Sequence, residues 1–202
     1  MSSSFDSHPS TIGQLLGDNE RRSVMLPQFQ RGFSWEKSHV ERFWADLTNF
    51  KSSFDSSPIS ASYFLGPIVL KPENEQLVLL DGQQRLATAT ILLAAMRDIA
   101  RGLDAGHGYL GADFARDIQV KYIQKGDDEP TRFSLVLGEL DEPYFMAAIQ
   151  KDPPVAPTCV LRSHRLIAEA RTLLSEKLNA TIATRDAESA VKALKSLRDC
   201  LV

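Results

Sequence analysis

The stretch from Leu77 to Arg97 constrains the fold more than any other part of the chain. Its apolar run, Leu77 to Leu80, is followed at once by the polar string Asp81 to Arg85 (DGQQR). Apolar residues then recur at helical spacing as far as Met96. This pattern predicts a buried strand, a tight turn at Gly82 and a helix that begins at that turn.

Two interpretations of this turn are open. The N-terminus of the predicted helix offers unpaired backbone N–H groups at the positive end of a dipole, which suits an anion. The simpler interpretation is capping, because Asp81 is a good N-cap and Asp81 with Gln84 resembles a capping box. Capping does not explain Arg85, whose charge opposes the helix dipole at a cost of about 0.3–1 kcal/mol unless a phosphate or carboxylate compensates it.

Composition limits the class of protein. The chain has 202 residues, 43% of them hydrophobic, which is enough to bury a core. No apolar run approaches the roughly 20 residues of a membrane span, and residues 1–10 lack the features of a secretory signal. We therefore expect a cytoplasmic protein with no membrane association.

Charge and cysteine content narrow the functions further. The net charge of −3 provides no overall basic field for nucleic acid, so any polyanion contact must be local or lie outside this chain. Cys159 and Cys200 are far apart, and the four histidines are scattered along the sequence. These positions indicate neither a disulfide framework nor a zinc site.

A second string of unusual composition runs from Pro27 to Trp35 (PQFQRGFSW). Gly32 permits an unusual backbone angle, and Ser34 fits the N-cap of a helix whose apolar face extends from Val40 to Phe50. The string therefore predicts a turn that leads into an amphipathic helix.

The side chains of this string differ in their expected roles. We expect Phe33 and Trp35 chiefly to pack in the core where the helix starts. Gln30 and Arg31 are polar residues beside a large aromatic surface, and such groups tend to need a partner. These two are therefore candidate binding residues.

The remaining sequence alternates short strand patterns with helical ones. Strands are predicted near Val24, at 63–70 with an interruption at Gly66, at 76–80 and at 131–137. Helices are predicted at 11–16, from about Trp35, from about Gln84, and at 112–124, 141–150, 160–178 and 186–202. The segments at 63–70 and 76–80 form a hairpin that brings Gly66 near the start of the central helix.

These elements predict a mixed α+β fold, a small sheet packed by helices. The proline-rich segment Asp152 to Pro157 marks a break in organisation. We therefore expect one domain at 1–152 and a C-terminal helical extension at 153–202, which leads to a domain outside this chain. Strand order and oligomeric state are not readable from the sequence.

The two strings at 27–35 (PxFQRxFxW) and 81–86 (DGQQRL), with Tyr63 to Gly66 (YFLG) between them, resemble the N-terminal domain of the GmrSD family of restriction endonucleases. This family belongs to the ParB/sulfiredoxin-like superfamily. The resemblance extends to Arg132-Phe133, Tyr144-Phe145 and the pair Ser163-His164. It therefore covers most of the chain.

The resemblance implies a role in bacterial defence against foreign or modified DNA. It implies that this domain binds and hydrolyses a nucleoside triphosphate (GTP, ATP or CTP) with Mg²⁺. It also implies DNA as a partner, through the full-length protein or a partner subunit, and an HNH-type nuclease domain. The His-rich metal site of that nuclease has no counterpart here, so this chain is not expected to cut DNA by itself.

Together the resemblance and the residues define a candidate NTPase site. The predicted nucleotide- and phosphate-binding residues are Gln30, Arg31, Gly66, Gly82 and Arg85. The predicted catalytic residues are Asp81, Gln83, Gln84 and Arg85. In this hypothesis Asp81 holds a divalent metal or orients water, Gln83 or Gln84 positions the attacking water, and Arg85 is a bidentate donor to phosphate.

Two other functions remain open. In the first, the chain is a non-catalytic DNA-binding module in which Gln30, Arg31, Phe33 and Trp35 contact a DNA backbone or a modified base. In the second, DGQQR is only a capped turn, and the helices after Pro157 dock a partner. A sulfiredoxin-like activity is disfavoured because neither cysteine lies near these strings in the sequence.

Overall fold

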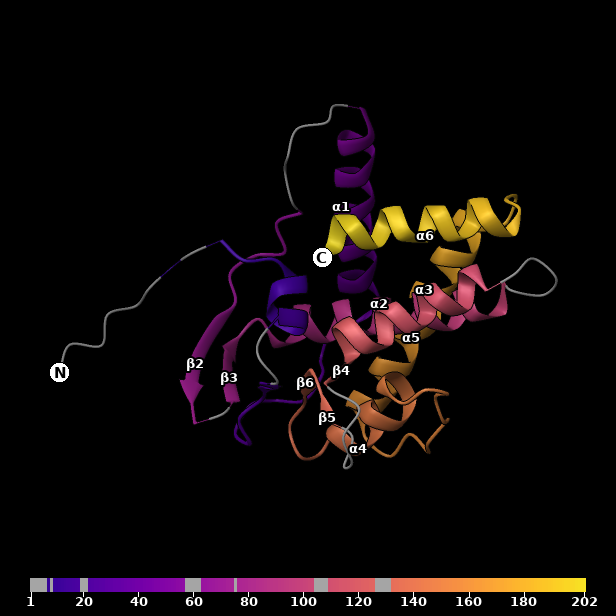
Figure 1. Cartoon of the computed structure of the whole chain (residues 1–202). Coiled ribbons are helices and arrows are strands. Elements are labelled where there is room, and N and C mark those ends of the chain that lie inside the picture. Colours follow the sequence, from indigo (N-terminus) through magenta and orange to yellow (C-terminus); the bar gives the residue numbers. More distant parts are fainter. Residues whose placement is uncertain are drawn as a thin grey trace.

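A four-stranded sheet forms from segments that lie far apart in the sequence (Figure 1). Its strands are β1 (Val24–Met25), β2 (Val69–Glu73), β3 (Gln76–Asp81) and β6 (Leu135–Val136), in the order β2-β3-β1-β6. β1 is parallel to β3 and β6, and β2 is antiparallel to β3. This computed structural model describes residues 7, 9–18, 22–56, 63–74, 76–103, 109–125 and 132–202.

Helices make up most of the remaining structure. The α-helices are α1 (Lys37–Ser56), α2 (Gln83–Gly102), α3 (Leu110–Ile118), α4 (Glu142–Phe145), α5 (Arg162–Ile182) and α6 (Ala187–Leu201). The π-helical segments are η1 (Gln14–Asp18), η2 (Gln119–Ile123) and η3 (Met146–Gln150), and a separate hairpin pairs β4 (Gln124–Lys125) with β5 (Arg132–Phe133). No helix in these ranges is long and apolar enough to cross a membrane.

Four connecting segments meet at one edge of the sheet. The carboxyl ends of the parallel strands β1, β3 and β6 lie at the same edge, and the amino end of the antiparallel β2 lies there too. The segments 26–36, 63–68, 81–82 and 137–141 therefore all reach the sheet at this edge. In open α/β sheets this is the edge where ligands bind.

The core is organised around α2, which packs against α3, α5 and α6. Most of its side chains are buried, including Leu86, Leu93 and Met96. The apolar stripe predicted for 160–178 is also buried, with Ile167 and Leu174 fully inaccessible. α5 and α6 bury their apolar residues in the same core as the sheet.

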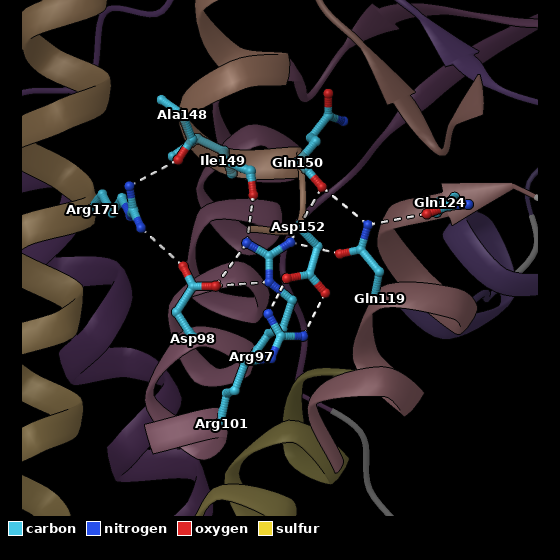
Figure 2. A network of polar contacts seen from close by, with 10 residues as sticks. All are labelled: Arg97, Asp98, Arg101, Gln119, Gln124, Ala148, Ile149, Gln150, Asp152 and Arg171. Atoms are coloured by element: carbon cyan, nitrogen blue, oxygen red, sulfur yellow. Dashed lines mark hydrogen bonds and ion pairs between the residues drawn. The ribbon is translucent and has the colours of Figure 1, made fainter. Parts of the chain in front are cut away.

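A fully buried arginine in α2 was not singled out from the sequence. Figure 2 shows Arg97 at the centre of a polar network. Its guanidinium donates to Oε1 of Gln119 at 2.6 Å, and to the carbonyl oxygens of Ile149 at 3.0 Å and Gln150 at 3.2 Å. Its Nε donates to Asp98 at 2.8 Å. Arg97 thereby ties α2 to η2 and to the end of η3.

The network continues toward α5 and the surface. Arg171 of α5 donates to Asp98 and to the carbonyl oxygen of Ala148, each at 2.9 Å. Arg101 forms a two-pronged ion pair with Asp152, and its hydrogen bond holds the pKa of that carboxyl below its usual range. The charged pairs around the buried arginine therefore come from α2, α5 and the segment after η3 (Figure 2).

The predicted α+β class is confirmed, and so is the strand, turn and helix at 76–102. The assignment to the ParB/sulfiredoxin-like superfamily stays a prediction. Within 131–137, of which Thr131 lies outside the described residues, the single predicted strand is wrong. Ser134 separates β5 from β6, because its N–H bonds Ile123 while its carbonyl bonds Val24. In 63–70 only Val69 and Leu70 belong to a strand, and Gly66 before them has φ of +105°.

Candidate functional site

Gly82 is the N-cap of α2, with φ of +101° and no side-chain hydrogen bond to the first turn. The capping box that the sequence allows therefore does not form. A Cβ at Gly82 would lie 3.0 Å from Cγ1 of Ile68, so the turn also packs closely against the segment before β2. The first backbone N–H groups of α2 lack a side-chain cap and lie at the carboxyl edge of the sheet.

Gln84 reaches from this turn to the string at 27–35. Its Oε1 accepts from the backbone N–H of Ser34 at 2.8 Å and of Trp35 at 3.3 Å. Its Nε2 donates to the carbonyl oxygen of Gly32 at 3.2 Å, and the residue is 8% exposed. Both ends of the amide are therefore occupied by backbone groups, and Gln84 positions the loop that precedes α1.

Gln30 makes the reciprocal connection, from the loop back to β3. Its Nε2 lies 2.8 Å from the carbonyl oxygen of Leu79 and 3.0 Å from that of Leu80. The two sequence strings are thus bound together by side-chain amides in both directions. The predicted site assumed that the two strings lie close together, and the structure shows that they do.

Arg85 lies against the segment before β2. Its Nη2 donates to the carbonyl oxygen of Pro67 at 2.6 Å and lies 3.4 Å from Oδ2 of Asp81. The Arg85 side chain is 26% exposed and the Asp81 side chain 61%. Among the described residues Nε and Nη1 of Arg85 have no acceptor. The guanidinium therefore keeps donors for an anion.

Asp141 also contacts the loop before α1, a contact that the sequence did not predict. It is 3% exposed, and its carboxylate accepts from the backbone N–H of Phe33 at 2.8 Å and from the hydroxyl of Ser163 in α5. A Cβ at Gly32 would lie 2.6 Å from its Oδ2. Asp141 thus fixes the same loop that Gln84 fixes. A lone aspartate carries no sequence signal for this role.

The aromatic residues near the site differ in how far they are exposed. Phe33 is buried at 5% exposure, and Trp35 is half-buried and packs against His39 and Phe43. The expected core role therefore suits Phe33 better than contact with a base. Phe29 and Phe64 are instead 85% and 80% exposed.

Two polar residues of the predicted site remain available. Arg31 is exposed and Gln83 is half-buried. Neither side chain has a hydrogen-bond partner in the part of the chain that the structure describes. Both are therefore free to contact a ligand.

The site offers one carboxylate for a cation. Within the described ranges no three His, Cys, Asp or Glu side chains gather as a metal-binding group. Asp81 is exposed beside the uncapped turn. Such a single carboxylate fits Mg²⁺, which is commonly held by one or two carboxylates together with phosphate oxygens and waters.

We expect Gly66→Ala to destabilise the site. The position has φ of +105°, so a side chain there strains the backbone, and the added Cβ would lie 2.6 Å from Nη1 of Arg85 and displace that guanidinium. The expected loss is about 1–3 kcal/mol of unfolding free energy, measured by urea denaturation. Gly138→Ala is the matched control, because no heavy atom lies within 4 Å of its Cβ position. Equal stability of the two variants would contradict the packing described here.

In a comparison with protein families, residues 12–199 match the GmrSD restriction endonuclease, N-terminal domain. No curated protein matches the chain significantly. The family match includes both strings of the site, the whole of α5, and α6 except its last two residues. The chain therefore belongs to the GmrSD restriction endonuclease N-terminal domain family, and is a domain of a restriction and defence protein.

Proposed function

We propose that this domain binds and hydrolyses a nucleoside triphosphate, and so acts as the sensor or regulatory part of the restriction protein. The observation that carries the proposal is the turn at Gly82. Uncapped N–H groups of α2, spare donors of Arg85 and an exposed carboxylate of Asp81 occur together there. Phosphate binding needs such N–H groups and a guanidinium.

The individual roles follow from which atoms remain available. The first turn of α2 and Arg85 would bind phosphate oxygens, and exposed Arg31 would add charge from the facing loop. Asp81 would hold Mg²⁺, which neutralises charge on the phosphates when bound. Gln84 is excluded as an acceptor for the attacking water, because its Oε1 already accepts from the N–H groups of Ser34 and Trp35.

The proposal is tested with purified protein by measuring phosphate release from GTP, ATP and CTP in the presence of Mg²⁺. We expect an Asp81→Ala/Arg85→Ala double variant to lose at least ~100-fold in turnover, since removal of one such stabilising contact commonly costs this much. Circular dichroism would establish that the variant is folded.

The control is Arg42→Ala/Asp46→Ala, which removes an exposed ion pair of the same spacing from α1. Its turnover should equal that of the wild type. Equal turnover by the two double variants would reject the site at Gly82. Absence of turnover in the wild type would reject nucleotide hydrolysis by this chain.

A DNA-binding module is the second candidate, and exposed Phe29 and Phe64 favour it. Both precede residues of the site, Gln30 and Gly66, and exposed aromatic rings stack on bases. DNA binding that weakens steeply with salt, without nucleotide turnover, would support this function over the first. The overall charge of −3 argues against it.

A further inference from the structure

The amide of Gln30 has a fixed orientation. Both of its near neighbours, the carbonyl oxygens of Leu79 and Leu80, are acceptors, so the amide nitrogen must face them. An amide nitrogen carries two hydrogens, and these two bonds use both. Gln30 therefore has no donor left for a phosphate oxygen, which removes the predicted phosphate contact.

The other end of the same amide is unsatisfied. Oε1 of Gln30 is buried and accepts no hydrogen bond in the described part of the chain. Buried polar atoms in native proteins nearly always have a partner, and exceptions mark a catalytic role or an absent water or ion. Because Oε1 is an acceptor, its missing partner is a donor.

The position of Gln30 indicates which donor is the missing partner of its Oε1. Its amide is attached to the last carbonyls of β3, immediately before Asp81 and the first turn of α2. In the proposed NTPase site this turn holds the phosphates. The donor next to a bound triphosphate that hydrolysis requires is water.

We infer that Oε1 of Gln30 accepts a hydrogen bond from the water that attacks the γ-phosphorus, which makes Gln30 the water-orienting catalytic residue. This inference rests on the proposed nucleotide hydrolysis. The water oxygen forms a bond to the γ-phosphorus, and the bond from phosphorus to the βγ-bridging oxygen breaks. The nucleoside diphosphate leaves with the electron pair of the broken bond. Both protons of the water go with the released phosphate, which then loses protons to the solvent.

The neighbouring glutamines make the assignment specific. Oε1 of Gln84 already accepts from the backbone N–H groups of Ser34 and Trp35, and its Nε2 donates to the carbonyl oxygen of Gly32, so Gln84 offers a water no unused acceptor. Gln83 has a free side chain, but no contact fixes its orientation. Gln30 alone among these three combines a fixed amide with an unused acceptor, which is what orienting a water requires.

The experiment compares the steady-state kinetics of Gln30→Met, Gln30→Glu and the control Gln76→Met with those of the wild type, using the triphosphate that the wild type hydrolyses. We expect Gln30→Met to lower kcat by at least ~100-fold while KM changes less than about threefold, because the lost contact is to water and not to the nucleotide. Gln30→Glu keeps an acceptor but loses both donors to the carbonyl oxygens of Leu79 and Leu80, so its carboxylate is no longer held in place and kcat should also fall by at least ~100-fold. Gln76→Met changes an exposed glutamine at the opposite end of β3 and should leave both constants unchanged.

Each outcome of this experiment supports or overturns the role of Gln30. Unchanged kcat in Gln30→Met, or a change confined to KM, would overturn the inference and leave nucleotide hydrolysis standing. A wild type without turnover would overturn both. If Gln30→Met does not fold, Gln30→Glu decides: an unchanged kcat in this variant would show that a fixed amide at position 30 is not needed and would overturn the inference.

Discussion

Arg97→Met is expected to lower the unfolding free energy by about 3–5 kcal/mol, the usual cost of removing one partner from a buried charged network. Methionine fills much of the same volume, so the loss reports the polar contacts. The carbonyl oxygen of Ile149 and Oε1 of Gln119 would lose their donor in a buried setting, and the carbonyl oxygen of Gln150 would keep only its bond from Nε2 of Gln119 (Figure 2). Urea denaturation followed by circular dichroism measures the effect.

Arg101→Met is the matched control, one turn further along the same helix. Arg101 is 43% exposed, and its ion pair with Asp152 is at the surface. Such pairs contribute about 0–1 kcal/mol, so this variant should unfold close to the wild type. Similar denaturation midpoints for the two variants would show that the buried network does not hold η3 against α2.

The central element could be predicted because its signals are local. The run from Leu77, the glycine at 82 and the helical spacing that follows lie within one short stretch. The order of the strands in the sheet could not be predicted, because β1 and β6 are each two residues long. Their pairing depends on hydrogen bonds such as Val24 N–H to the carbonyl of Ser134, between residues far apart in the sequence.

The residues of the candidate site could be predicted in outline, but the role of each residue could not. Residue types and spacing identified both strings, and the hairpin placed Gly66 beside Arg85 as expected. Which aromatic ring is exposed was not readable, because Phe29 and Phe33 occur in the same string and only packing separates them. Asp141 was missed because its bond to Phe33 depends on the tertiary structure alone.

The two adjacent glutamines illustrate the same limit. The sequence made Gln83 and Gln84 interchangeable candidates for positioning water. The turn at Gly82 directs one amide into the loop before α1 and leaves the other without a partner in the described structure. Neighbouring helical residues point in directions about 100° apart, so a shared motif does not imply a shared role.

Gln84→Leu is therefore expected to affect stability and turnover together. Two backbone N–H groups, of Ser34 and Trp35, and the carbonyl of Gly32 would lose their partner, at a cost of about 1–3 kcal/mol in unfolding free energy. Displacement of the loop would move Gln30 and lower kcat by on the order of 100-fold, as small misplacements of catalytic groups do. Urea denaturation and phosphate release measure the two effects.

Gln83→Leu separates this structural role from a chemical one. The two residues are neighbours of the same type, but the protein does not use the amide of Gln83 for stability. Its leucine variant should unfold like the wild type. If Gln84→Leu instead kept full stability and lost only kcat, Gln84 would contact the reacting groups directly. The amide would then have to leave the loop when nucleotide binds, and the loop would be a moving part of the site.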